Sequence, residues 1–503
     1  MKVLMFGWEF PPHISGGLGT ACAGLTRALE KAEVDVLFAV PKIHGDESAN
    51  RTTFINASVI PIRQKKIILN EECHPDSPVY AGIIPRASAF SGKVLQNQTE
   101  STRTVVAVSS YLMPYRAVHE TGSLALLDWN YAFHAPVDRT LPANIRSRRT
   151  PPRNPGTRQV KYIKEPYPFS GTYGPDLLGE VSRYAQAGVE IARRYSFDVI
   201  HAHDWMTFPA GMAASKVSGK PLVVHVHATE IDRSGATVDP KVFAIEKEGM
   251  HIADKVVTVS NWTKKIAIQH YQVNEDKITV VHNGITPRTD TCIPATPPPL
   301  SSPIVTFLGR ITHQKGPLHF VEAARKVHET FPDVHFVVVG SGDQLPNMIE
   351  RIAQLKMSEN FHFTGFLSGE EIDRTWAMSN IYVMPSVSEP FGLAPLEAIQ
   401  AGVPVILSKQ AGVSEVMPHA IKVDFWNREA LAEAICNLLR FKSLTNTLKK
   451  NGAEQIKNLT WDKAAEKLTT LYYELSSKHD RPAKSDDLLS GSPAKKAAYP
   501  PVL

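Results

Sequence analysis

Cysteine is scarce in this chain of 503 residues, which contains four, at positions 22, 73, 292 and 436. They lie far apart and form no C-x-x-C pair, so they indicate neither a zinc site nor a disulfide framework. A reducing cytoplasm suits this usage. Long apolar runs are also missing: residues 3–6 are followed by Glu9 and two prolines, too early for a signal-peptide core. No stretch approaches the ~18 apolar residues of a membrane helix, so we expect no integral membrane contact.

The chain also lacks a strong excess of one charge. Its 55 basic and 50 acidic residues leave a net charge of +5, too small to imply nucleic acid as the main partner. Apolar residues make up 43% and charged residues 21%, which excludes a collagen-like or wholly disordered chain. The one local bias is the segment 139–164, with eight basic residues and no acidic one. A solvated loop is one interpretation, and a lid that attracts an anionic acceptor or partner surface is the other.

Short β-branched runs recur along the chain, each followed by a turn and a helical stretch. They occupy residues 2–6, 34–40, 198–201, 221–227, 255–260 and 278–282, and then 304–308, 334–339, 361–363, 381–384 and 403–407. Continuous apolar runs alternating with helices predict βαβ units with parallel strands. The fold class is therefore α/β, with two doubly wound Rossmann-like domains that face a central cleft.

A proline-rich stretch at 294–303 separates the two series of strands and predicts a linker. We place the first domain at 1–290 and the second at 300–460. The first domain contains an insertion at about 45–175, in which 104–109 is a strand candidate. The tail 478–503 is rich in Pro, Ala, Ser and Lys, and we expect it to be disordered.

Three loops at predicted strand ends contain residues that suit anion or sugar binding. The first strand leads into a loop with Gly16 and Gly17, followed by a helix from about residue 20 to 31. Backbone N–H groups of such a loop can approach an anion, although tight turns in any βα unit look similar. In the second domain Arg310 and Lys315 follow a strand, and two permanent cations can neutralise a diphosphate. Singly, each could equally be a cation of a solvated loop.

The third loop, at 385–398, contains Glu389 and Glu397 eight residues apart. Between them Phe391, Gly392 and Leu393 precede a predicted helix, whose first N–H groups can take phosphate while carboxylates bind sugar hydroxyls. Surface helix charges are a poor alternative, because Glu389 lies between apolar segments.

The order of these motifs resembles a known family. With His201-Ala202-His203-Asp204-Trp205 and His282-Asn283-Gly284, they are similar to retaining glycosyltransferases of the GT-B fold. The closest likeness is to glycogen and starch synthases of family 5 and to family 4 enzymes, over residues 1–40 and about 180–460.

The resemblance implies a role for each matching residue. Arg310 and Lys315 would bind the donor diphosphate, Glu397 the nucleotide ribose and Glu389 the transferred sugar. The expected catalytic residues are His227, Glu389 and Asp204, and the expected donor-binding residues are Gly16, Gly17, Asn283, Arg310, Lys315, Phe391, Gly392, Leu393 and Glu397.

Two of these assignments have simple alternatives. His227 matches a histidine that contacts the donor sugar near the reacting carbon, but it could be only a polar residue that ends a strand. Asn283-Gly284 could be only a turn. We expect His225 to point to the opposite face of its strand from His227.

The resemblance implies transfer of a sugar, glucose from ADP-glucose or UDP-glucose, to an acceptor hydroxyl such as that of α-glucan. One departure leaves the donor base open: Ile14 stands where glycogen and starch synthases carry a lysine linked with ADP-glucose. The alternatives are a family 4 enzyme that makes a disaccharide, glycolipid or other glycoconjugate from a UDP- or GDP-sugar, a non-catalytic sugar-nucleotide or glucan-binding module, and a membrane-surface scaffold. No D-x-D triplet occurs, so we expect no metal ligand, no cofactor and metal-independent transfer.

Overall fold

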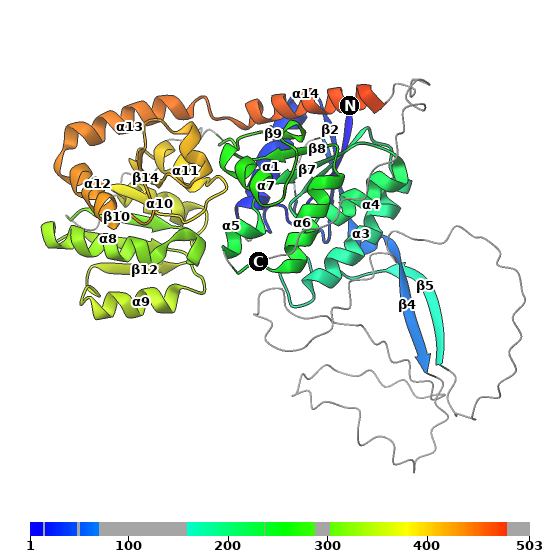
Figure 1. Cartoon of the computed structure of the whole chain (residues 1–503), viewed down its shortest axis with the longest axis horizontal. Coiled ribbons are helices and arrows are strands. Elements are labelled where there is room, and N and C mark those ends of the chain that lie inside the picture. The colour runs from blue at the N-terminus through cyan, green and yellow to red at the C-terminus, as the bar shows by residue number, and fades with distance from the viewer. Residues whose placement is uncertain (14–15, 48–50, 70–157, 236, 287–301, 480–503) are drawn as a thin grey trace, which may run out of the picture.

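The computed structural model of the chain describes residues 1–13, 16–47, 51–69, 158–235, 237–286 and 302–479. The strand candidate 104–109, the position of Ile14, most of the proline-rich linker and nearly all of the C-terminal tail lie outside these ranges. Two parallel sheets, each covered by helices, lie side by side in Figure 1. The predicted α/β class with two Rossmann-like domains is confirmed.

The first sheet has seven parallel strands in the order β3-β2-β1-β6-β7-β8-β9. They are β1 (Lys2–Phe6), β2 (Asp35–Val40), β3 (Thr52–Asn56), β6 (Val199–His203), β7 (Leu222–Val226), β8 (Lys255–Thr258) and β9 (Ile278–Val280). Its helices are α1 (Gly17–Lys31), α3 (Leu177–Arg194), α4 (Phe208–Ser218), α5 (Glu230–Ser234), α6 (Pro240–Ile252) and α7 (Asn261–Gln269). The strand order reverses around β1, and such a switch point opens a crevice at the carboxyl ends of the strands.

The second sheet has six parallel strands in the order β12-β11-β10-β13-β14-β15. They are β10 (Ile304–Leu308), β11 (His335–Val339), β12 (Phe361–Gly365), β13 (Ile381–Met384), β14 (Val405–Ser408) and β15 (Ile421–Val423). Its helices are α8 (Pro317–Thr330), α9 (Leu345–Gln354), α10 (Glu370–Met378), α11 (Ala394–Gln400), α12 (Arg428–Arg440) and α13 (Lys442–Ile456). Here the switch point lies between β10 and β13, beside the loops of both sequence motifs.

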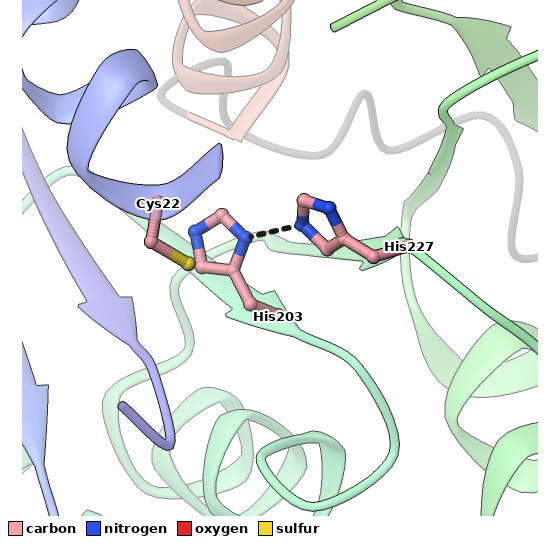
Figure 2. Close-up of side chains that lie close together, drawn as sticks. All are labelled: Cys22, His203 and His227. Carbon is pink, nitrogen blue, oxygen red and sulfur yellow. Dashed lines mark hydrogen bonds between the residues drawn. The ribbon is translucent and has the colours of Figure 1, made fainter. Parts of the chain in front are cut away.

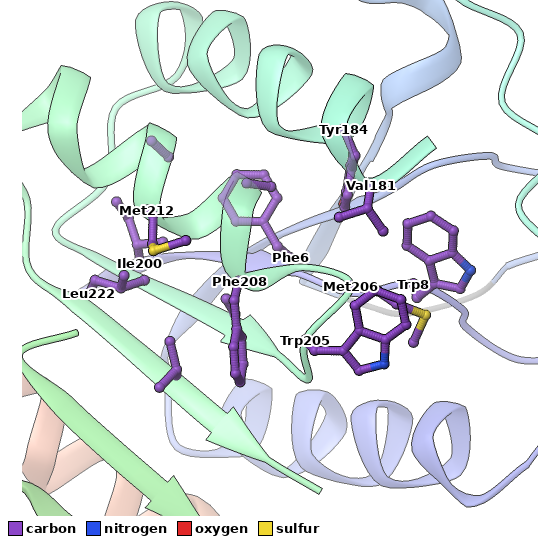
Figure 3. Close-up of a cluster of buried hydrophobic side chains, with 14 of the residues drawn as sticks. Phe6, Trp8, Val181, Tyr184, Ile200, Trp205, Met206, Phe208, Met212 and Leu222 are labelled. Atoms are coloured by element: carbon purple, nitrogen blue, oxygen red, sulfur yellow. The ribbon is translucent and has the colours of Figure 1, made fainter. Parts of the chain in front are cut away.

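The apolar strands predict these sheets because both of their faces are buried. Figure 3 shows part of the core of the first domain, where the rings of Phe6 and Tyr184 pack edge to face with centroids 5.8 Å apart and Phe208 belongs to the same cluster. Tyr184 is fully buried and donates its hydroxyl to the carbonyl of Ala39 at 2.7 Å. This core fixes the strand ends that carry the site.

The structure adds two features to the domain outline expected from the sequence. Within the insertion range 45–175, Thr52–Asn56 is the edge strand β3 of the first sheet, and β4 (Pro61–Leu69) pairs with β5 (Arg158–Pro166) in an antiparallel ribbon that extends from the first domain in Figure 1. The last seven residues of the basic segment 139–164 therefore lie in a strand, while 139–157 are outside the described residues.

The last helix, α14 (Trp461–His479), follows the second domain in sequence but packs on the first. It crosses above the first sheet in Figure 1, and its buried Leu468 and Tyr472 join a core that contains Val3 and Leu25. An apolar helix face predicts burial but not which sheet will cover it. Among the described helices, none has both the length and the apolar character that crossing a bilayer requires.

Candidate active site

The two domains meet through hydrogen bonds between loops at the carboxyl ends of their strands. Ser388 accepts a hydrogen bond from the indole N–H of Trp262 at 3.1 Å and donates one to Asp232 at 2.6 Å. Ser260, at the start of α7, donates to the carbonyl of Pro390 at 2.6 Å. The loop that contains Glu389 is therefore held from both sides by the first domain, through partners that the sequence alone did not reveal.

Lys315 and Glu389 form an ion pair at this loop. Glu389 is 6% exposed and also accepts a hydrogen bond from Ser386 at 3.3 Å. Gly316 allows the Lys315 turn to approach the end of β13: its φ is +68°, and a β-carbon there would lie 2.1 Å from the carbonyl oxygen of Pro385. The structure thus brings together two of the predicted residues that are 74 positions apart.

Arg310 is exposed at the end of β10, and its side chain makes no hydrogen bond or ion pair within the described ranges. It lies five residues before Lys315, so the same strand end offers one paired and one free cation. A phosphate group could recruit Arg310 without breaking any existing contact.

The glycine-rich loop of the first domain lies against the second domain. Gly16 is the N-cap of α1, and a β-carbon on Gly17 would be 4.0 Å from the Cδ1 atom of Leu393. Leu393 in turn is the N-cap of α11, directly after Gly392, whose φ of +95° favours glycine.

A cleft of about 260 Å³ lies between α1 and α11. Glu397 and Leu393 line it from the second domain, and Thr20 and Arg27 line it from the first. Gly284 also lines this cleft, and its neighbour Asn283 is 8% exposed. Phe391, by contrast, is a core residue: it is 2% exposed and packs within an apolar cluster.

A second cleft, of about 470 Å³, opens in the first domain beside the start of α1. Its lining includes Trp8, Glu9, Lys42 and Tyr173. Glu9 accepts a hydrogen bond from the backbone N–H of Gly19 at 3.1 Å, so its carboxylate stabilises the first turn of α1. Aromatic rings beside carboxylate and ammonium groups suit a polyhydroxylated ligand.

Asp204 holds the backbone of His227. It follows β6 with a φ of +60°, and its Oδ1 atom accepts from the N–H of His227 at 2.6 Å and of Ala228 at 3.3 Å. Burial raises the pKa of Asp204 to about 6, against the opposing effect of the Arg233 charge. In this arrangement the Asp204 carboxylate positions His227.

Four histidines lie together on β6 and at the end of β7: His201, His203, His225 and His227. The rings of His225 and His227 stack with centroids 4.2 Å apart, so the prediction that they point to opposite faces is wrong. Residues two apart in a strand share a face. The alternation of H-x-H in both strands was the sequence signal for this cluster.

The histidines pair across the two strands. His203 Nδ1 and His227 Nε2 share a hydrogen bond of 3.0 Å (Figure 2), and His201 Nε2 and His225 Nδ1 share one of 3.2 Å. His201 Nδ1 is also 2.5 Å from the hydroxyl of Tyr472 on α14. Burial lowers the pKa of His227 to about 3, so its ring is neutral at ordinary pH.

The fold and this site define a class of protein, and three family models match the chain in sequence order. "Starch synthase catalytic domain" matches residues 2–82, "Glycosyltransferase Family 4" matches 145–289, and "Glycosyl transferases group 1" matches 290–455. Each matched segment is thus similar to a glycosyltransferase family, the chain has the GT-B fold, and it is similar to glycogen and starch synthases.

Individual relatives agree with this assignment. The chain is 29% identical to alpha-maltose-1-phosphate synthase of Mycolicibacterium smegmatis, over 56% of this chain and 79% of the relative. It is 26% identical to glycogen synthase of Mycobacterium tuberculosis, over 52% of this chain and 66% of the relative. The solved structure of sucrose-phosphate synthase from Thermosynechococcus elongatus has the same fold, with a TM-score of 0.60, 17% identity and coverage of 95% of this chain and 99% of the other.

Proposed function

We propose that this chain transfers a hexosyl group from a nucleotide-sugar donor to an acceptor hydroxyl, with retention of configuration and without a metal ion. The observation that carries the proposal is the close approach of Gly17 to Leu393, where a β-carbon on Gly17 would lie 4.0 Å from the Leu393 Cδ1 atom. It brings the glycine-rich start of α1 against the loop that holds Lys315 and Glu389. A diphosphate at this point would meet cations from one domain and backbone N–H groups from the other.

Each group near this contact has a use in such a transfer. Arg310 and Lys315 supply charge to a departing diphosphate, which is the work that a metal ion does in other transferases. Glu389, once Lys315 turns to the phosphate, is left to accept hydrogen bonds from sugar hydroxyls. Glu397 lines the 260 Å³ cleft and suits the ribose. His227, neutral and held by Asp204, can hydrogen-bond the sugar beside the reacting carbon.

The donor that we propose is ADP-glucose or UDP-glucose, and the acceptor is α-glucan or a short glucoside. The names of two relatives, glycogen synthase and alpha-maltose-1-phosphate synthase, support a glucan-type product. The 470 Å³ cleft beside α1 is the acceptor site that we propose, because it lies in the first domain and has both aromatic and charged walls. Its volume is in the range of small-ligand pockets.

The first experiment is a thermal-shift panel with ADP-glucose, UDP-glucose, GDP-mannose and UDP-N-acetylglucosamine, since a ligand that binds only the native state raises its melting temperature. The donor that gives a shift is then incubated with glucose and α-glucan, and proton NMR of the product gives its anomeric configuration. Inverted product contradicts the retaining mechanism, and loss of activity with a chelator contradicts metal independence. Absence of any shift favours a binding module or scaffold.

Arg310→Ala tests the site itself. Loss of a preorganised charge at a leaving group lowers kcat by about 100-fold or more. Arg374→Ala is the matched control, because Arg374 is an exposed arginine that pairs with Glu370 on α10 of the same domain. Equal activity of the two variants would refute the assignment of Arg310.

A further inference from the structure

Cys22 of α1 lies beside His203 of β6 and His227, which follows β7 (Figure 2). One ligand atom from each residue, the Cys22 sulfur and a ring nitrogen of each histidine, lies within 4.8 Å of the other two. The three residues come from three separate segments of the chain, so no local spacing in the sequence predicts that they lie together. The position of Cys22 follows from packing, since α1 rests on the first sheet with Cys22 in its buried face.

The geometry is close to that of a metal centre. The facing nitrogens, His203 Nδ1 and His227 Nε2, are 3.0 Å apart. Two nitrogens on one tetrahedral zinc ion, each about 2.0–2.1 Å from the metal, are about 3.3 Å apart. The two nitrogens are thus near the separation that zinc requires, and the Cys22 sulfur, which lies on the other side of the His203 ring from His227 in Figure 2, would have to turn toward them to complete the group.

A second observation concerns Nε2, the other ring nitrogen of His203. His203 is fully buried, and its Nε2 atom has no hydrogen-bond partner in the described part of the protein. The His203 ring thus shares Nδ1 with His227 and leaves a second buried nitrogen available to a ligand. Cys22 is also fully buried, and burial raises the pKa of its thiol. Without a metal the group is therefore a neutral thiol between neutral rings, and a bound cation would displace the thiol proton to solvent.

We propose that Cys22, His203 and His227 form a site for a divalent zinc-like ion, with three protein ligands and the fourth position open to the cleft. One thiolate and two imidazoles are the ligand types that zinc prefers. The open position follows from exposure: His227 is partly exposed, while Cys22 and His203 are fully buried. An ion can thus enter from the side of His227.

Occupation of this site turns transfer off. The ion takes the Nε2 atom of His227, whose ring is proposed above to hydrogen-bond the donor sugar, and it adds positive charge beside the reacting carbon. This consequence rests on the proposed function, whereas the binding site itself does not.

The site is tested with Co²⁺ as the probe, because a thiolate ligand gives cobalt an intense near-ultraviolet charge-transfer band. The protein is the full chain with Cys73→Ala, Cys292→Ala and Cys436→Ala, which leaves Cys22 as its single thiol. We expect a charge-transfer band that saturates at one cobalt per chain and disappears when Cys22→Ala is added. Failure of the band to appear, or a band that survives Cys22→Ala, overturns the proposal. So does cobalt binding without a thiolate band, which would indicate the neighbouring group of His201, His203 and His225.

Two histidine variants complete the ligand set. His203→Asn removes the buried ligand, and His227→Ala removes the one at the rim, where loss of folding is less expected because the side chain is partly exposed. Each should weaken cobalt affinity at least about tenfold, the lower limit seen even for residues that only support a ligand. Far-ultraviolet circular dichroism reports folding. Unchanged affinity in a folded His227→Ala variant overturns the site.

Inhibition is measured separately, as the Zn²⁺ concentration that halves transfer in the wild type and in Cys22→Ala, each relative to its own metal-free rate. The wild type should be inhibited reversibly, with activity restored by a chelator, and Cys22→Ala should need at least about tenfold more zinc. Equal inhibition of both proteins refutes the regulatory role. A cobalt band in a protein with no transferase activity on any donor would refute the proposed function and leave the metal site standing.

Discussion

Glu415 joins the two domains, and its replacement should separate them. It lies in the 3-10 segment Gly412–Val416 of the second domain, and all its hydrogen bonds come from the first. The carboxylate accepts from the backbone N–H groups of Asn261 at 2.8 Å and Trp262 at 2.7 Å, and from the Asn261 side chain at 2.9 Å. His282 adds a contact at 3.1 Å. Because Asn261 and Trp262 begin α7, the charge also faces the positive end of a helix dipole.

The size of the effect follows from these contacts. A hydrogen bond to a charged group contributes about 1.5–3 kcal/mol, and the Glu415 side chain is 23% exposed, so water recovers part of this on separation. We expect Glu415→Ala to cost the joined arrangement about 2–3 kcal/mol, which changes the ratio of joined to separated domains by about 30- to 140-fold. The ratio of joined to separated domains in Glu415→Gln should lie between those of the wild type and Glu415→Ala, since the glutamine amide oxygen still accepts hydrogen bonds but has no charge.

Small-angle scattering measures the outcome as the radius of gyration, which should rise in Glu415→Ala. Glu454→Ala is the control, because it removes an exposed glutamate of the same domain that pairs only with Lys457. The pH dependence has a definite sign. Hydrogen bonds from His282, Asn261 and Trp262 outweigh burial and lower the pKa of Glu415 below 4.5. The contact is therefore intact above pH 4.5 and is lost as pH falls through the lowered pKa. Identical scattering of wild type and Glu415→Ala at all pH values would refute this reasoning.

Two further predictions concern the histidine cluster and its supports. Tyr472→Phe leaves the buried Nδ1 atom of His201 without the hydroxyl that lies 2.5 Å away, and it should lower the free energy of unfolding, measured by urea titration, by about 1–3 kcal/mol. The control is Tyr473→Phe, which changes an exposed neighbour and should leave the free energy of unfolding unchanged. Equal effects of the two variants would contradict the role of the Tyr472 hydroxyl. Asp204→Asn tests how the protonation of this carboxyl is coupled to folding. Burial raises the pKa of Asp204 from 3.8 to about 6, so the folded protein holds the proton more tightly than the unfolded chain does. This stabilisation of the folded state is complete below pH 3.8, and about 3 kcal/mol of it is lost as pH rises to 6. The difference in stability between variant and wild type should follow that curve, and a difference independent of pH would disprove the shift.

The sequence predicts the two sheets well for a physical reason. Strands buried on both faces need continuous apolar runs, and such runs are visible one segment at a time, as at residues 304–308 and 381–384. The loops at their ends follow, because parallel strands carry their carboxyl ends to one edge. Lys315 and Glu389 could thus be expected at one place before any contact was seen.

What the sequence did not reveal depends on contacts between distant segments. The apolar face of α14 is visible as a helical period, but nothing local assigns it to the first sheet. Glu415 and Ser388 look like ordinary polar loop residues until their partners from the first domain are present. The sequence did not predict the group of Cys22, His203 and His227 for the same reason, since Cys22 has no second cysteine nearby and the two histidines are about 180 residues or more away.

The chain connects the two domains twice, and the two connections are joined to each other by backbone contacts. One crossing leaves the first domain after Thr286, and the other returns before Trp461. They are joined: Ile285 pairs with Thr460 in a parallel bridge and donates its N–H to the carbonyl of Leu459 at 2.9 Å. A β-carbon on Gly284 would lie 2.2 Å from the backbone nitrogen of Trp461, so only glycine permits this approach. Because the described ends of both connections are tied at this point, we expect relative motion of the domains to be a rotation about it. The Glu415 contact lies on other loops and breaks in that rotation, whereas α14 and the histidines move with the first domain as one unit.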